Sequence, residues 1–593
     1  MSNQIHIIQN AITTTISEIF RGDFRRICEV KKAVLHLEAI YFCHGTCYLL
    51  KRENMPIKDQ LALYQRIELI PQSTTEFFEN NRECIINNWP EESALAAKPE
   101  ILYDALLASE FCVQPERVGY KIDKVSRDIA GAYYTSSDFS AQITYRALES
   151  YMDRKRRRAI DSDSFACCNE YENITFLDYS CGCGEFLLAV IQYFDNYVLG
   201  YSRKKLATQL RGVDVNPIAL MITIARIVSA VEAEDDENLL REVAKNFIVG
   251  NPLLHSDKIA PLEVRFDNFA LNRLYAETEG INCLELEQQN LVVLGNPPWE
   301  KLRFEEQAFF RPVCPAISAI SQKNKREKEI KKLAVNWLEL LEYYQLLQDD
   351  YASVKKEIPK HPLLKVSLVG ELNTYAMFAE LASRLTEKDG FAAIIVKSAL
   401  VTSTCYSSCF RHFVNQGSLS EVFLFDNREK LFQIDSREKF CVLFFGGEHA
   451  GGIKVHYGLT KQEQILSSVP INVTSEELEL INPETGLLPN VADSKEFSFL
   501  LRTHRSLSVF AKEFPKCHFG RLVHLTAHAE HISTKSEKTR VPIYEGKFIE
   551  QYDNRFSTFA GMSADERYQA KASARRQPGD SFVAPKPAPE CRY

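Results

Sequence analysis

An asparagine, two prolines and a tryptophan follow a short aliphatic run in the stretch LVVLGNPPWEKL. Residues 291–294 are typical of a buried parallel strand, because all four side chains are apolar. Pro297 and Pro298 have no backbone N–H and a fixed φ angle, so strand pairing must end there. The sequence predicts a stiff loop from Asn296 to Trp299 at the carboxyl end of a strand, where open α/β sheets bind ligands. A rigid turn around a packed tryptophan is the alternative that this tetrapeptide leaves open.

A glycine-rich turn between a predicted strand and a predicted helix is the second candidate, in ITFLDYSCGCGEFLLAVIQYF (residues 174–194). The strand ends at Asp178, and Gly182 and Gly184 allow a tight turn with no Cβ atom between the backbone and a ligand. The N–H groups at the start of the helix favour a negatively charged group. Such turns occur in several kinds of site, so this one indicates a nucleotide-like cofactor without identifying it.

Two further strand ends carry polar side chains. Asp214 ends a predicted strand about 30 residues after the glycine-rich turn, where an acidic side chain can accept hydrogen bonds from both ribose hydroxyls. Asn251 ends the next strand and can bond the edge of an adenine ring. Each residue alone is equally explained as a loop cap or turn former. Three polar strand ends in succession, followed by the Pro-Pro loop, favour a ligand site.

The elements that must position these residues follow the pattern of a parallel sheet. Residues 1–125 have apolar side chains at helical spacing, and from about residue 126 short apolar strands alternate with helices. Residues 301–365 are charged and helical, and the strand pattern then resumes before an irregular, polar end. We therefore expect a helical N-terminal region (1–125), an α/β core (126–455) with a helical insertion (301–365), and a separate C-terminal region (456–593).

The composition is that of an ordinary soluble globular protein, with 45% hydrophobic and 25% charged residues among 593. No run of about 18 apolar residues occurs, which argues against a membrane span, and the first residues do not resemble a signal peptide. Sixteen scattered cysteines are typical of the reducing cytosol, so a cytoplasmic location is expected. The net charge is −8, but residues 501–593 hold 16 Lys and Arg against 10 Asp and Glu, which is compatible with nucleic acid at that end.

In their order along the chain, these motifs resemble those of the gamma class of DNA adenine-N6 methyltransferases, over roughly residues 125–560. The downstream segments FDNREKLFQIDSREKFCVLFF and VPIYEGKFIEQYDNRFSTF resemble parts of the long type IIG-like enzymes of restriction-modification and phage-defence systems. The resemblance implies a Rossmann-like core that binds S-adenosyl-L-methionine, followed by a C-terminal target-recognition region. The segment GAYYTSSDFSAQITYRALE is similar to the part that closes over the methionine end of the cofactor. The cofactor-binding residues implied by this correspondence are Tyr134, Thr135, Asp178, Ser180, Gly182, Gly184, Asp214, Val215 and Asn251.

The resemblance also gives the Asn-Pro-Pro-Trp loop a catalytic role. The lone pair of an exocyclic amino nitrogen is delocalised into the ring, which makes the nitrogen a poor nucleophile. The Asn296 side-chain oxygen and the Pro297 carbonyl can each accept one amino hydrogen, which favours the tetrahedral nitrogen that attacks a sulfonium methyl group. Pro298 helps to fix this geometry, and Trp299 is expected to offer a stacking face to an adenine flipped out of the duplex.

The sequence departs from the family in places, and other functions stay open. Tyr179 and Asn251 stand where many relatives have a proline and an acid. The chain stops at ECRY, close to where relatives continue, so a truncated recognition domain is one interpretation. Methyl transfer to RNA or to a protein amide nitrogen is the first alternative function. A non-catalytic subunit that binds DNA or partners in a defence complex is the second.

Neither a metal site nor a nuclease is predicted. His528 and His531 have a conceivable metal spacing, but no second ligand pair accompanies them. Asp23, Glu29 and Lys31 are faintly like the acids and lysine of metal-dependent nucleases, but their spacing is short and their segment is predicted to be helical. The expected partners are double-stranded DNA and other subunits of a restriction or defence system, with no membrane.

Overall fold

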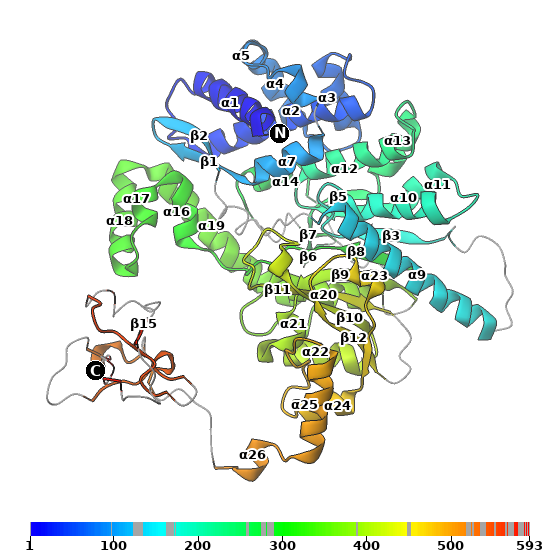
Figure 1. Cartoon of the computed structure of the whole chain (residues 1–593). Helices are drawn as coiled ribbons and strands as arrows, with labels where there is room; N and C mark the ends of the chain where they lie inside the picture. The colour runs from blue at the N-terminus through cyan, green and yellow to red at the C-terminus, as the bar shows by residue number, and fades with distance from the viewer. Residues whose placement is uncertain are drawn as a thin grey trace. The chain divides into compact units, whose positions relative to one another are not determined.

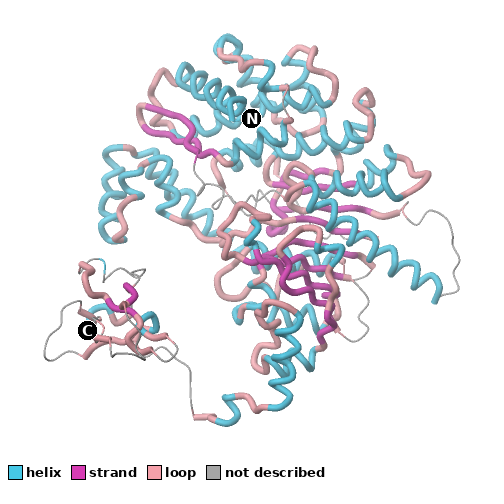
Figure 2. The backbone as a smooth tube through the Cα atoms, viewed as in Figure 1, coloured by secondary structure: helices cyan, strands magenta, loops and turns pink. Residues whose placement is uncertain are grey.

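The computed structural model describes residues 2–591 except for a set of gaps. The gaps are 97, 123–134, 162–170, 172, 257–259, 274–279, 282–289, 387–388, 447–451, 517–522, 525–526, 534–540, 551–552, 564–565, 567–573, 579–585, 588 and 590. The chain forms two compact units, residues 1–506 and residues 507–593. Figure 1 and Figure 2 show the course of the chain and its secondary structure.

The first part of the larger unit is a group of helices with one hairpin. The helices are α1 (Ser2–Ile19), α2 (Ile27–Leu49), α3 (Ile57–Arg66), α4 (Gln72–Asn80), α5 (Arg82–Asn87), α6 (Glu92–Leu95) and α7 (Pro99–Leu107). Strands β1 (Ser109–Gln114) and β2 (Arg117–Ile122) pair antiparallel. This hairpin differs from the prediction that residues 1–125 form a helical region. Helix α7 ends before it, and the two strands carry strand-favouring residues on either side of a turn that contains Pro115; these residues are Phe111, Val113, Val118, Tyr120 and Ile122.

A nine-stranded sheet forms the core of the unit, in the order β13-β12-β10-β11-β9-β8-β3-β4-β5. Figure 2 shows these strands in magenta. Their bounds are β3 (Thr175–Asp178), β4 (Leu210–Asp214), β5 (Phe247–Val249), β8 (Leu291–Gly295), β9 (Phe391–Lys397), β10 (Leu419–Asp426), β11 (Lys439–Phe445), β12 (Ile453–Leu459) and β13 (Ile471–Val473). Strands β5, β4, β3, β8 and β9 are parallel, and β11 lies antiparallel between β9 and β10.

The order of the parallel strands is that of a Rossmann-like sheet. Numbered along the chain, β5, β4, β3, β8 and β9 are the third, second, first, fourth and fifth strands, and the winding reverses between β3 and β8. All five residues of β8 are buried, as expected of a central parallel strand. The predicted α/β class and Rossmann-like core are confirmed.

Helices of the core connect and cover these strands. They are α9 (Ser137–Asp161), α10 (Glu185–Tyr197), α11 (Arg203–Gln209), α12 (Pro217–Ala230), α13 (Glu237–Ala244), α14 (Leu262–Ala270), α20 (Thr374–Leu385), α21 (Ala399–Thr402) and α22 (Ser407–Asn415). Two short strands, β6 (Asn251–His255) and β7 (Gly280–Ile281), pair outside the main sheet. Helix α12 packs against β4 and β5 on one side and against α2 and α7 on the other, so the N-terminal helices lie directly on the core.

The segment between β8 and α20, which includes the predicted insertion 301–365, is helical. It consists of α16 (Glu306–Val313), α17 (Pro315–Ser318), α18 (Lys323–Asn336), α19 (Leu338–Glu357) and the 3-10 turn η2 (Ile358–Lys360). Figure 1 shows α16, α17 and α18 as an arm that extends beyond the sheet.

The larger unit extends further along the chain than the sequence predicted. The boundary expected after residue 455 falls inside β12, and β13, α23 (Gln464–Ser467), α24 (Ser475–Ile481) and α25 (Ser494–Ser506) all belong to this unit. The strand pattern of β12 follows several glycines and includes polar residues, so it is weaker than the aliphatic runs before it.

The smaller unit has little regular structure. It contains α26 (Phe510–Glu513), β14 (Ser557–Thr558) and β15 (Arg575–Arg576), with a small apolar cluster of Phe548, Phe559 and Cys591. In the described parts of both units, every helix is too short or too polar to cross a bilayer. Within the same residues, no group of three or more His, Cys, Asp or Glu side chains is arranged to hold a metal ion.

Candidate functional site

The carboxyl ends of β3 and β8 meet where the winding of the sheet reverses. A Cβ atom added to Gly295, the last residue of β8, would lie 2.7 Å from Oδ1 of Asp178, the last residue of β3. Gly295 therefore allows the Asp178 carboxyl to lie against the β8 backbone. Because Asn296 comes next in the chain, the Pro-Pro loop and the glycine-rich turn start from the same point. This edge is where open α/β sheets bind their ligands.

The glycine-rich turn requires glycine at two positions. Gly182 and Gly184 have φ angles of 50° and 86°, in the left-handed region that side chains disfavour. A Cβ atom on Gly184 would also come within 2.7 Å of the Thr223 side chain on α12. The Thr223 hydroxyl donates a hydrogen bond to the Gly182 carbonyl at 2.7 Å. The turn is thus fitted against α12 before the chain enters α10.

Asp214 at the end of β4 holds this turn from the other side. Its Oδ2 accepts a hydrogen bond from the Gly182 N–H at 2.8 Å, and its Oδ1 accepts one from the Asn216 N–H at 2.9 Å. Burial raises the pKa of Asp214, while these backbone N–H groups act in the opposite direction. Val215, which follows, is 39% exposed. The structure thus joins the predicted ribose-binding acid directly to the glycine-rich turn.

Asp178 is almost completely buried beside them. It is 2% exposed, and its Oδ1 accepts a hydrogen bond from the Ser180 N–H at 3.0 Å. Burial raises the pKa of Asp178 to about 8; the bond from Ser180 opposes this rise and the charge of Asp214 adds to it. At neutral pH the Asp178 carboxyl is therefore mostly protonated in this structure.

We predict that Asp178→Asn stabilises the protein more at pH 8 than at pH 5. Because the folded-state pKa is about 8 and the usual value is 3.8, the stabilisation from the protonated carboxyl is fully present below about pH 4 and is lost as the pH rises to 8. Asparagine cannot ionise, so the variant keeps this stabilisation at pH 8. Urea unfolding of both proteins at the two pH values measures the difference, with the exposed Asp59→Asn as the control. The same gain at both pH values would contradict a raised pKa.

The start of α20 fixes the Pro-Pro loop. The Thr374 hydroxyl donates to the Pro298 carbonyl at 2.6 Å and accepts from the Glu300 N–H at 2.9 Å. The Thr374 N–H donates in turn to the Glu300 carbonyl at 2.9 Å, and the Leu302 N–H donates to the Leu372 carbonyl at 2.9 Å. The loop geometry therefore depends on α20 as well as on the two prolines.

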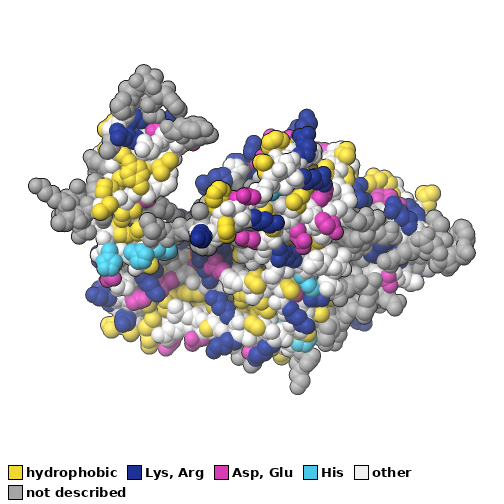
Figure 3. Space-filling model, turned by 90° about the horizontal axis from the view of Figure 1, so that it is seen from below, with side chains coloured by type: hydrophobic (Ala, Val, Ile, Leu, Met, Phe, Trp, Pro, Cys, Tyr) yellow, Lys and Arg dark blue, Asp and Glu magenta, His cyan; other side chains and the backbone are white. Residues whose placement is uncertain are grey.

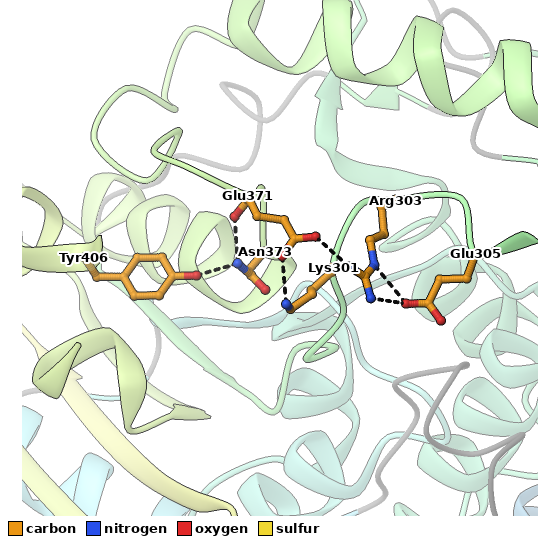
Figure 4. A network of polar contacts seen from close by, with 6 residues as sticks. All are labelled: Lys301, Arg303, Glu305, Glu371, Asn373 and Tyr406. Carbon is orange, nitrogen blue, oxygen red and sulfur yellow. Dashed lines mark hydrogen bonds and ion pairs between the residues drawn. The ribbon is translucent and has the colours of Figure 1, made fainter. Parts of the chain in front are cut away.

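A polar network continues from the loop and joins exposed ion pairs to the buried Asn373 and Tyr406. Glu371 pairs with Lys301 at 2.7 Å and with Arg303 at 3.2 Å. The Asn373 side-chain amide donates to the Glu371 carbonyl at 2.7 Å and to the Tyr406 hydroxyl. Figure 4 shows the members of this network, which are Lys301, Arg303, Glu305, Glu371, Asn373 and Tyr406. The network ties the residues after the loop to the segment that holds it.

Trp299 is enclosed, whereas the sequence analysis expected an open stacking face. Its side chain is 6% exposed, and its indole N–H donates to the Ile395 carbonyl at 3.4 Å. Its ring lies 5.3 Å from the Phe432 ring and 6.1 Å from the Phe440 ring, between centroids. In this conformation Trp299 anchors the loop in an aromatic cluster. The cluster forms because β11 and the segment before it bring apolar rings to the loop.

The remaining predicted residues are placed as follows. Thr135 is buried just before α9, and Phe139 in the first turn of α9 contacts Phe432 of the aromatic cluster at 6.3 Å between centroids. The start of α9 thus lies beside the loop, whereas Tyr134 lies outside the described residues. Asn251 begins β6, and its side-chain oxygen accepts a hydrogen bond from the Leu253 N–H at 3.0 Å.

Two residues at this edge were missed by the sequence analysis. Arg226 of α12 donates to the Cys183 carbonyl in the glycine-rich turn, and it pairs with Glu185 at 2.7 Å and with Glu100 of α7 at 4.0 Å. The sequence signal for Arg226 was that it is the only charged residue in the apolar run PIALMITIARIVSA. Glu300 follows Trp299, and burial raises the pKa of Glu300 to about 7. A titratable group of this kind beside a candidate catalytic loop is a candidate for function.

A cavity of about 330 Å³ opens at the same edge of the sheet, beyond the end of β9. Ser398 after β9, Asp426 at the end of β10 and Lys439 at the start of β11 contribute to its lining, and so does Phe425. The Phe425 ring stacks on Phe440 of the aromatic cluster at 5.0 Å between centroids. The cavity is therefore next to the cluster that contains Trp299, but its lining contains none of the predicted cofactor residues.

Comparisons with known proteins give distant structural matches only. No family model and no curated protein matches the chain. A DrdV–DNA complex matches with a TM-score of 0.42 and 11% identity, over 80% of this chain and 44% of that chain. A nuclease-deletion mutant of the type ISP restriction-modification enzyme LlaGI, bound to a DNA substrate mimic, gives 0.39 and 12%, over 78% and 35%. The methyltransferase subunit of a type I restriction-modification system from Streptococcus thermophilus gives 0.31 and 11%, over 85% and 93%.

This chain spans less than half the length of the first two of these proteins. The site itself is a Rossmann-like switch point at which a glycine-rich turn, two acids and an Asn-Pro-Pro-Trp loop come together.

Proposed function

We propose that this protein transfers a methyl group from S-adenosyl-L-methionine to the N6 amino group of an adenine flipped out of duplex DNA. We place it in a restriction-modification or phage-defence system as the modification component. The observation that carries the proposal is the convergence of Asp178, Asp214 and Asn296 at one edge of the sheet. Asp214 bonds the glycine-rich turn at Gly182, and Asp178 lies against Gly295, the residue before Asn296.

The donor set fits a nucleoside that carries positive charge. Asp214 stands where a second-strand acid accepts ribose hydroxyls, and the glycines leave the backbone of the turn open to close approach. Asp178 is a buried acid whose pKa is raised to about 8, and a nearby cation would favour its ionised form. S-adenosyl-L-methionine has both a sulfonium and an ammonium group, and when bound it supplies an electrophilic methyl group.

The loop provides acceptors for an amino group. The Thr374 hydroxyl already engages the Pro298 carbonyl, whereas the Asn296 oxygen and the Pro297 carbonyl are the proposed acceptors for the two amino hydrogens. Accepting both hydrogens localises the nitrogen lone pair, and this interaction is strongest in the transition state. A carboxamide is a poor base, so these residues position the nitrogen and do not remove its proton.

Transfer of labelled methyl groups to three substrates tests this proposal. We expect label in unmethylated genomic DNA, recovered as N6-methyladenine after digestion to nucleosides, and none in RNA or ribosomal proteins. Label in RNA or protein but not in DNA would show that the substrate is RNA or protein and not DNA. Cofactor binding without transfer to any DNA, alone or with partner subunits, would favour the non-catalytic alternative.

A further inference from the structure

The helical arm begins and ends at the candidate catalytic loop. Lys301, two residues after Trp299, forms a β-bridge with Asn373, and α16 starts shortly afterwards. The chain returns through η2, which packs on β6, to the segment before α20 that holds the loop. Phe304 at the base of the arm contacts Tyr351 of α19 at 5.8 Å between ring centroids. Any large substrate at this edge therefore lies beside the base of the arm.

Helix α18 of this arm has one packed side and one basic side. Its 14 residues, KNKREKEIKKLAVN, contain six Lys or Arg and two Glu, a net charge of +4. Arg326, Ile330 and Leu333 are buried and lie at a spacing that defines one side of the helix. The other side is exposed and carries four lysines, which we call the α18 basic face: Lys325, Lys328, Lys331 and Lys332.

Most lysines of the α18 basic face have no acidic partner among the described residues. Lys332 pairs with Glu329 at 2.7 Å. Lys325, Lys328 and Lys331 form no ion pair with the described part of the chain. Elsewhere on the surface, as on the face drawn in Figure 3, Lys and Arg side chains are interspersed with Asp and Glu. Residues 1–500 carry a net charge of −14, so the basic face stands out on an acidic unit.

We propose that the α18 basic face contacts the phosphate backbone of the DNA whose target adenine enters the site. This inference rests on the proposed function and adds the place of a second contact to it. Lysine is a point charge that suits phosphates and carries no sequence information, so the contact positions the duplex. At a rise of 1.5 Å per residue, α18 is about 21 Å long and matches roughly six base pairs of duplex.

Replacing three of these lysines tests the inference. In Lys325→Gln, Lys328→Gln, Lys331→Gln the helix keeps its packed side and loses three charges. The matched control is Lys98→Gln, Lys245→Gln, Lys454→Gln, three exposed lysines outside the arm that likewise form no ion pair with the described part of the chain and give the same change in charge. Fluorescence anisotropy measures the affinity for a duplex of about 40 base pairs, which is longer than the arm. The measurement is repeated at salt concentrations between about 50 and 200 mM.

We expect the slope of log K against log salt to become less steep by about 2 to 3 in the α18 variant and to stay unchanged in the control. Cofactor affinity and the thermal midpoint should stay at wild-type values in both. A slope equal to wild type in the α18 variant, or an equal loss in both variants, would overturn the inference. Failure of the wild-type protein to bind or methylate any duplex would instead overturn the proposed function.

Discussion

Asn296→Ala is expected to lower the rate of methyl transfer by about 100-fold or more. This is the size of the loss when one preorganised hydrogen-bonding group that stabilises a transition state is removed. The methyl side chain cannot accept an amino hydrogen, so the nitrogen lone pair stays delocalised. The loop itself should persist, because the Pro298 carbonyl keeps its bond from Thr374 and Trp299 stays in its aromatic cluster. Cofactor affinity should therefore change by less than about twofold.

Single-turnover kinetics and titration calorimetry together measure both quantities for this variant. Asn415→Ala, at an exposed position at the end of α22, is the control for removal of a carboxamide. A rate within tenfold of wild type would show that Asn296 does not hold the amino group. Loss of cofactor binding together with transfer would show that the residue supports the fold of the edge.

Asp214→Ala is expected to weaken the binding of S-adenosyl-L-methionine by roughly 10- to 100-fold, because each hydrogen bond to a charged acceptor contributes about 1.5–3 kcal/mol. Two effects act together. The ribose hydroxyls lose their acceptor, and the N–H groups of Gly182 and Asn216 lose the carboxylate that orients the turn. In contrast to Asn296→Ala, the transfer rate should recover when the cofactor is saturating.

Asp214→Asn separates these two effects. Its amide oxygen can accept one of the two backbone hydrogen bonds, so the turn is partly retained and the loss of affinity should be smaller. The exposed Asp235→Ala, in the loop before α13, is the control for loss of an acidic side chain. Calorimetry measures the cofactor affinity of the three variants. Unchanged affinity in Asp214→Ala would contradict the assignment of Asp214 to the ribose.

Local sequence patterns were sufficient to predict the strand ends of this site. The aliphatic run of β8 predicts a central strand by itself, and the two prolines mark its end. The positive φ angles of Gly182 and Gly184 follow from the need to turn sharply between β3 and α10. Because parallel strands end at one edge, the approach of Asp178 to the Asn296 loop follows from the order of strands.

Features that depend on distant partners were not predictable in this way. The burial of Trp299 depends on Phe432 and Phe440, which lie far along the chain and have no local link to the loop. The place of β12 in the main sheet is fixed by pairing with β10, although a weak local pattern and several glycines indicated a boundary there. The contacts of Arg226 depend on the packing of three helices, because its partners Glu100 and Glu185 lie on α7 and α10.

The packing of α12 has a consequence for how such a protein can change by recombination. This helix is buried on nearly every side, because the sheet covers one face and α2 and α7 cover the other. A cassette cut at the start of the α/β core would leave an apolar surface exposed to water and Arg226 without Glu100. Ancestral exchange or laboratory shuffling must therefore transfer the N-terminal helices together with α12 and the glycine-rich turn that packs on it.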